Sequence, residues 1–197
     1  MVDIPQVITE IVAASAQHVP LVVGVAGLSN AGKTTLCQLL TSELAGRVLH
    51  LRCDDFSVHS YRQRSLRAED PRDWCAWDDV QAVLQVLRVS HRAAYDRGWN
   101  RETGELNVHL DLRLPDHPNP VVLCDGSYLL HSPVRDMFDR LLFVDTPVEI
   151  ALERGRTRAV RNGRPGSADY SERLTRAVPY FEEFACVAHW TWRAAAP

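Results

Sequence analysis

The sequence predicts an α/β fold in which helices cover both faces of a parallel sheet, giving three layers. Apolar runs alternate with stretches of helical periodicity along most of the chain, the pattern of successive βα units. One glycine-rich loop joins an apolar run directly to a helical stretch, as when a buried strand turns into a helix. With 197 residues, 46% of them hydrophobic, the chain can build one sizeable core but not two. We therefore expect a single domain over residues 1–197.

The first helix and the first strand are expected over residues 4–17 and 21–26. Apolar residues from Ile4 to Val12 recur at helical spacing, and Pro20 ends the pattern. The run 21–26 contains no polar side chain, which suits a strand that is buried on both faces.

The later elements follow from the same two periods. Leu36, Leu39 and Leu40 fall on one face of an expected helix, and Pro147 favours the first turn of another. The expected strands cover residues 21–26, 47–53, 120–125, 140–145 and 185–190. The expected helices cover residues 4–17, 33–45, 77–94, 147–161 and 169–183.

Residues 95–119 do not follow this alternation. The segment contains two glycines and two prolines and is followed by Pro120, and only Leu106 to Leu112 alternate between apolar and polar residues. Long irregular segments are uncommon in compact domains and are usually functional. We expect an irregular insertion on the substrate side of the domain.

Residues Gly27 to Thr34 read Gly-Leu-Ser-Asn-Ala-Gly-Lys-Thr and match the phosphate-binding pattern G-x-x-x-x-G-K-[ST]. Backbone amides of such a loop, together with the start of the next helix, can cradle phosphate oxygens. Lys33 is the only lysine of the chain, and its compact ammonium suits a phosphate contact. The loop predicts binding of a nucleoside triphosphate.

Composition excludes several other classes of function. The net charge of −3 gives no field that favours nucleic acid. Five cysteines without a C-x-x-C pair are typical of a reducing compartment, and the N-terminus has no unbroken apolar segment. We expect a cytoplasmic protein without a membrane or nucleic-acid partner. The eight histidines form no i, i+4 pair, so no zinc site is predicted.

Three of the expected strands end in an acidic residue: Asp54, Asp125 and Asp145. Ligands of parallel sheets gather at the carboxyl ends of the strands. Phosphoryl transfer needs oxygen ligands for magnesium and a group that accepts the proton of the attacking hydroxyl. We expect Thr34 and Asp125 to bind the metal and Asp54 to act as the general base. The alternative for Asp54 and its neighbour Asp55 is a structural role in a turn or helix cap. Asp145 is expected to cap the following helix.

Arginines are concentrated in the expected helix 147–161 and in the turn after it: Arg154, Arg156, Arg158, Arg161 and Arg164. Guanidinium groups pair with phosphate oxygens in a two-pronged manner, so residues 154–168 suit a lid over bound phosphates. The alternative is a solvated face that complements the end of the helix.

The ordered motifs together resemble the uridine kinase and nicotinamide riboside kinase group of P-loop kinases. The resemblance spans roughly residues 20 to 190. It rests on Gly27-x-Ser29-x-x-Gly32-Lys33-Thr34-Thr35, Asp54-Asp55-Phe56, Trp77-Asp78, Asp125-Gly126, Leu142-Phe143-Val144-Asp145-Thr146 and Tyr180-Phe181-Glu182-Glu183-Phe184.

The resemblance implies a P-loop NTPase fold with a five-stranded parallel core and an arginine-bearing lid. It also implies transfer of phosphate from ATP, with Mg²⁺, to the 5′-hydroxyl of a ribonucleoside. Asp54 matches the catalytic aspartate of the group, Asp78 the carboxylate that grips the ribose, and Trp77 the aromatic beside the base. Tyr95 resembles an aromatic that lines the nucleoside pocket. The group usually has glutamate where this chain has Asp125.

The predicted site follows from the loop, the strand ends and the resemblance. Lys33, Asp54 and Arg158 are the expected catalytic residues. The nucleotide is assigned to Gly27, Ser29, Asn30, Ala31, Gly32, Lys33, Thr34, Thr35, Arg154 and Arg158. The metal is assigned to Thr34, Asp54 and Asp125. The acceptor is assigned to Asp54, Asp55, Phe56, Trp77, Asp78, Tyr95 and Asp125.

Other functions fit the same loop. A kinase for pantothenate, a sugar or a sugar phosphate would use the same phosphate-binding residues. A non-catalytic nucleotide-binding module is a further alternative. A GTPase switch that depends on an N-K-x-D sequence is nearly excluded, because the single lysine lies in the phosphate loop. The sequence leaves the oligomeric state open.

Overall fold

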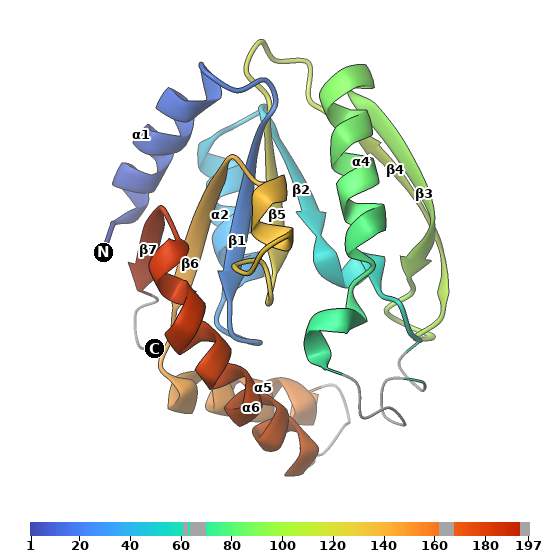
Figure 1. Ribbon diagram of the computed structural model, residues 1–197, viewed down its shortest axis with the longest axis vertical. Helices are drawn as coiled ribbons and strands as arrows, with labels where there is room; N and C mark the ends of the chain where they lie inside the picture. Colours follow the sequence, from blue (N-terminus) through green and yellow to red (C-terminus); the bar gives the residue numbers. More distant parts are fainter. Residues whose placement is uncertain (61–62, 64–69, 162–167, 194–197) are drawn as a thin grey trace.

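The computed structural model describes residues 1–60, 63, 70–161 and 168–193, without the side chains of residues 168–170 and 173. Its main sheet has five parallel strands in the order β2-β5-β1-β6-β7 (Figure 1). The α/β class and the five-stranded parallel sheet are confirmed. The strands are β1 (Leu21–Gly27), β2 (Val48–Arg52), β5 (Val121–Gly126), β6 (Arg140–Asp145) and β7 (Trp190–Arg193).

The two central strands are buried along their whole length. Every residue of β1 and of β5 is buried, as expected for apolar strands covered on both faces. In the sheet Val25 is paired with Asp125 and Gly27 with Val144. The loop after β1 therefore begins beside the ends of β5 and β6, which is the edge where the sequence predicts ligands.

The α-helices whose bounds the structure describes are α1 (Ile4–Ser15), α2 (Lys33–Glu43), α4 (Trp77–Ser90), α5 (Val148–Arg161) and α6 (Ala168–Phe184). Short 3₁₀ helices are η1 (Cys53–Phe56), η2 (Pro71–Trp74), η3 (Val134–Met137) and η4 (Ala185–Val187). Figure 1 shows α5 and α6 together at the end of the molecule toward which β1 runs, and α4 beside the hairpin β3–β4. Within the described part of the chain, no helix combines the length and apolarity needed to cross a membrane.

The prediction that residues 95–119 are irregular is wrong, because most of this segment belongs to a β-hairpin. Strands β3 (Arg92–Trp99) and β4 (Leu106–Arg113) pair antiparallel. Along β4 the apolar residues are half-buried and the residues between them are exposed. The turn after β3 is held by Asn100, whose side chain accepts hydrogen bonds from two backbone amides, and includes Gly104 at φ 78°. Asn and Gly stabilise such turns locally, so the segment is regular.

Two other elements differ from the prediction by more than two residues at a boundary. The helix expected over 77–94 ends at Ser90, because His91 adopts a left-handed conformation with φ 58° and terminates it. The strand expected over 185–190 is replaced by η4 over its first residues, and β7 begins only at Trp190.

Candidate active site

The phosphate loop joins β1 to α2 with the backbone geometry that its sequence demands. Gly32 caps α2 at φ 104°, in the left-handed region that favours glycine. A Cβ on Gly27 would lie 2.8 Å from the carbonyl oxygen of Val144, so only glycine allows this close approach to β6. The first backbone amides of α2 have no partner within the helix and are available to an anion.

The ammonium of Lys33 lies over this loop. Its Nζ donates to the carbonyl oxygens of Gly27 at 3.0 Å and Leu28 at 2.9 Å, and it lies 3.4 Å from Ser127 Oγ. Burial lowers the pKa of Lys33, and the nearby carboxylates of Asp125 and Asp54 act against this shift. A cation is thus held within reach of phosphates bound by the loop.

Thr34 and Asp125 meet beside the loop. The Thr34 hydroxyl donates to Asp125 Oδ2 over 2.6 Å, and Asp125 is buried. Burial alone would raise the pKa of Asp125, but contacts with His50, Thr34 and Lys33 outweigh it and lower the pKa. A carboxylate beside a hydroxyl supplies the oxygen donors that Mg²⁺ prefers, so the residues present fit this ion.

Arginines from α5 complete the phosphate side of the site. Arg154 donates to the carbonyl oxygen of Ala31 over 3.1 Å, and Arg158 lies 3.5 Å from Asn30 Oδ1. Both line a cavity of about 630 Å³ with the loop, Asp54, Asp125 and Arg161. The end of the predicted lid, residues 162–167 with Arg164, lies outside the described residues.

A second cavity, of about 240 Å³, adjoins the first and is mostly apolar. Its aromatic wall comes from η2, α4, the segment after β5, and α6: Trp74, Trp77, Tyr128 and Phe181. Burial raises the pKa of Tyr128 to about 12, so its hydroxyl is a neutral hydrogen-bonding group near pH 7. Such a cavity suits a flat or apolar organic group.

Asp54, Ser29 and Ser127 line both cavities. The first residues of η1 place the exposed carboxylate of Asp54 where a ligand in the apolar cavity would meet phosphates on the loop. The arrangement can bring a hydroxyl, a carboxylate and a phosphoryl group together at one point.

Asp55 faces a different part of the molecule from Asp54. Its buried carboxylate accepts a hydrogen bond from Arg52 Nε at 3.0 Å and another from Arg101 Nη2 at 3.3 Å. Arg101 follows β3, so Asp55 links the end of β2 to the hairpin.

The structure brings some predicted acceptor residues to the apolar cavity and not others. Trp77 lines it, and its Nε1 donates to the carbonyl oxygen of Arg72 over 2.7 Å. Phe56 is fully buried and stacks on Tyr95, with 4.5 Å between ring centroids. Tyr95 also donates to Asp79 over 3.1 Å. Like Asp55, both lie outside the described linings of these two cavities.

Asp78 is exposed at the start of α4 and is likewise absent from the described linings. Its predicted contact with a ribose stays a prediction.

The sequence did not point to several residues that line the cavities. Ser127 lies two residues after Asp125, so the rule that ligands gather at strand ends could have found it. Tyr128 directly follows Ser127, and Phe181 stands in a motif of the resemblance, but neither was assigned to the site, because the cavity forms only where α6 meets the segment after β5.

No known family model matches the chain. Uridine kinase-like protein 5 of Arabidopsis thaliana is 28% identical over 170 residues, which cover 84% of this chain and 36% of that protein. The uridine kinase of Chloroflexus aurantiacus strain J-10-fl is 28% identical over 172 residues, covering 84% of this chain and 80% of its own. The chain thus spans only about a third of the plant protein but most of the bacterial one.

Solved structures share the fold. D-glycerate 3-kinase from Cryptococcus neoformans superimposes with a TM-score of 0.68 and 16% identity, covering 96% of this chain and 93% of that one. Uridine kinases are thus homologues over most of this chain, and small-molecule kinases share its architecture. Together with the phosphate loop, these findings identify the chain as a P-loop kinase that acts on a small molecule and is related to the uridine kinases.

Proposed function

We propose that this kinase transfers the terminal phosphoryl group of ATP to the 5′-hydroxyl of a ribonucleoside. The observation that carries the proposal is the position of Asp54, which lines both the phosphate cavity and the aromatic cavity. The uridine kinases among the relatives support the same acceptor class.

The aromatic cavity suits the base of a nucleoside. Trp77 offers an aromatic surface to a base, Phe181 packs against Tyr128 at the back of the cavity, and Tyr128 and Ser127 offer hydroxyl groups. A cationic ring such as nicotinamide would gain further from an indole face. The described lining contains no arginine or lysine, which a small carboxylic acid such as D-glycerate would call for.

In this proposal each residue has a distinct part in phosphoryl transfer. The loop amides and Lys33 hold the phosphates and offset the negative charge of the transferred group. Arg154 and Arg158 supply further positive charge from α5. Asp54 accepts the proton of the attacking hydroxyl, the terminal phosphoryl group passes from ATP to that oxygen, and ADP leaves with the bridging oxygen.

Thr34, Asp125 and Asp54 would hold magnesium, which neutralises charge on the phosphates when bound. Their oxygen donors all line the phosphate cavity. His50, whose Nε2 lies 3.5 Å from Asp125 Oδ2, is outside the described linings of both cavities and is given no part in the transfer.

A coupled ADP-release screen tests the proposal. Nicotinamide riboside, uridine and cytidine are compared with D-glycerate, pantothenate and several sugars, with the Lys33→Ala variant as background. We expect a ribonucleoside to give the highest kcat/KM. A preference for D-glycerate or a sugar would overturn the acceptor class, and the same background-level ADP release with every compound would overturn the proposal as a whole.

A further inference from the structure

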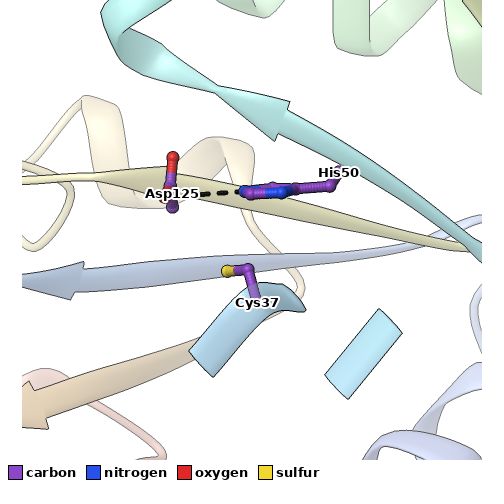
Figure 2. Close-up of side chains that lie close together, drawn as sticks. All are labelled: Cys37, His50 and Asp125. Carbon is purple, nitrogen blue, oxygen red and sulfur yellow. Dashed lines mark ion pairs between the residues drawn. The ribbon is translucent and has the colours of Figure 1, made fainter. Parts of the chain in front are cut away.

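A cluster of potential metal ligands lies behind the phosphate loop. It consists of Cys37 from α2, His50 from β2 and Asp125 from β5 (Figure 2). Their ligand atoms, Sγ, an imidazole nitrogen and a carboxylate oxygen, all lie within 4.8 Å of one another. Figure 2 shows the ring of His50 directed toward Asp125, with the side chain of Cys37 extending from α2 near this pair.

The imidazole of His50 points to a missing ligand. Its Nε2 is buried and has no hydrogen-bond partner among the residues that the structure describes; its ion-pair partner, Asp125 Oδ2, lies 3.5 Å away. A buried polar atom without a partner is costly, and most such atoms in proteins are satisfied by a protein group, water or an ion. An ion between Nε2 and the carboxylate would satisfy both.

We infer that Cys37, His50 and Asp125 form a site for a zinc-class divalent cation, separate in chemistry from the proposed magnesium position but sharing Asp125 with it. Sulfur and imidazole nitrogen are ligands that zinc accepts and magnesium avoids. Three protein ligands and one water is a common arrangement for zinc.

The distances are close to those that zinc requires. Bonds of about 2.0 to 2.3 Å in a tetrahedron place neighbouring ligand atoms about 3.3 to 3.6 Å apart. The pair from His50 and Asp125 is already at 3.5 Å. The widest separation in the cluster is at most 4.8 Å, so the ligands need to close by about 1 Å or slightly more.

A cavity reaches one ligand of the site. It has a volume of about 250 Å³, and its lining includes His50, Thr34 and Gln38 together with Leu110 and Leu112 of the hairpin. Polar groups at its inner wall could carry the fourth ligand, a water molecule.

Charge is balanced when the ion binds. A dication with one thiolate, one carboxylate and a neutral imidazole gives a net charge of zero in a buried place. The thiol proton of Cys37 leaves to solvent on binding. Burial and the neighbouring Asp125 raise the pKa of Cys37, so the metal itself has to displace that proton.

The first experiment uses Co²⁺ alone as a spectroscopic substitute for zinc, on the full chain under reducing conditions. We expect a near-ultraviolet thiolate-to-cobalt band and strong visible bands of tetrahedral coordination, both abolished by added Zn²⁺. The absence of the thiolate band would overturn the site.

Variants then identify the ligands. Cys37→Ser should remove the thiolate band, and both Cys37→Ser and His50→Gln should weaken Zn²⁺ binding by about tenfold or more. Cys186→Ser, at an exposed cysteine outside the cluster, is the matched control and should leave the spectrum unchanged. A band that persists in Cys37→Ser would place the thiolate elsewhere, for example at Cys53, and would overturn the assignment.

Thiol alkylation of the unaltered chain gives a test that does not depend on the folding of variants. Cys37 is fully buried, so alkylation is followed in urea below the unfolding transition, where local opening exposes the thiol. Zn²⁺ should slow alkylation of Cys37 there, measured by peptide mass spectrometry, and should leave Cys186 unaffected. Equal rates at Cys37 with and without Zn²⁺ would overturn the site.

A consequence for activity rests on the proposed function. Zinc bound to Asp125 should inhibit Mg²⁺-dependent phosphorylation, and Cys37→Ser should relieve the inhibition while it keeps the activity measured with Mg²⁺ and a zinc-selective chelator present. Metal binding without inhibition would separate the zinc site from catalysis, whereas inactivity under every condition would count against the kinase proposal alone.

Discussion

At the scale of single residues, Asp54 and Asp55 are neighbours in the sequence with opposite surroundings. Asp54 is exposed to the two adjoining cavities, whereas Asp55 is buried against Arg52 and Arg101. The 3₁₀ turn of η1 directs the two carboxylates apart. One side chain is therefore available for chemistry and the other for holding the structure.

Replacing Asp54 by asparagine should lower kcat by about 10²- to 10⁴-fold, because a positioned base typically contributes that much. The KM for ATP should change little, since the loop and the arginines hold the nucleotide. Steady-state kinetics with the best acceptor checks both values. Asp55→Asn is the matched control, which should alter stability more than kcat. Nearly normal turnover of the Asp54 variant would remove it from the mechanism.

Asp78→Ala tests the predicted grip on the ribose. If the exposed carboxylate turns toward a bound nucleoside, its loss should raise the KM for the nucleoside by about tenfold and leave the KM for ATP unchanged, since one lost hydrogen-bonding group is worth roughly 1.4 kcal/mol. Asp73→Ala, another exposed acid nearby, is the control. Unchanged constants for the Asp78 variant would show that another group binds the ribose.

The part of the site that could be predicted from the sequence consists of residues that are contiguous in the chain. The phosphate loop and its strand and helix were predictable because steric limits on the backbone tie Gly27 and Gly32 to their positions. The cluster of Cys37, His50 and Asp125 was not, since its members come from three elements that only the folded sheet brings together.

At the scale of elements, the hairpin is tied to the site through Arg101 and Asp55. Arg101→Ala should reduce the free energy of unfolding by about 1 kcal/mol or less, because the arginine is partly exposed and Arg52 still pairs with Asp55. Hydrogen exchange of residues 92–113 should become faster. Arg97→Ala, an exposed arginine of the same hairpin, is the control, and equal exchange in the two variants would argue against the tie.

The spacing of apolar residues along the sequence located most helices and strands but did not reveal β3. The apolar run of β1 and the apolar start of β5 are short and rich in β-branched residues, which favours buried strands, so both were predictable. Strand β3 has exposed residues at irregular intervals and shifts in register near Gly98, and this masks the alternation of a strand. Its partner β4 alternates regularly and was visible only as a short piece.

At the scale of the whole molecule, two histidines make stability depend on pH. Burial, and then the charge of Arg72, lowers the pKa of His131, and burial lowers that of His189. A lowered pKa means that the unfolded chain takes up the proton first as the pH falls. The free energy of unfolding is therefore unaffected by these histidines well above pH 6.5. It decreases as the pH falls from there through the lower pKa of the folded state.

Urea unfolding at several pH values between 7.5 and 5 should show this loss. His131→Asn should reduce the dependence on pH, whereas His91→Asn should not, because His91 is exposed and asparagine tolerates its left-handed backbone. The same slope in the His131 variant and the unaltered protein would contradict the assignment.

The two cavities adjoin, with Asp54, Ser29 and Ser127 lining both, and this arrangement has a kinetic consequence. Donor and acceptor can occupy their chambers simultaneously, so the reaction should follow a sequential order with intersecting double-reciprocal plots and no phosphorylated enzyme. One molecule that joins an adenosine oligophosphate to the acceptor would bridge both chambers, and it should bind far more tightly than either half because the second half binds at high effective concentration. Parallel plots, or radioactive phosphate retained on the protein, would contradict a direct transfer between molecules bound in the two cavities.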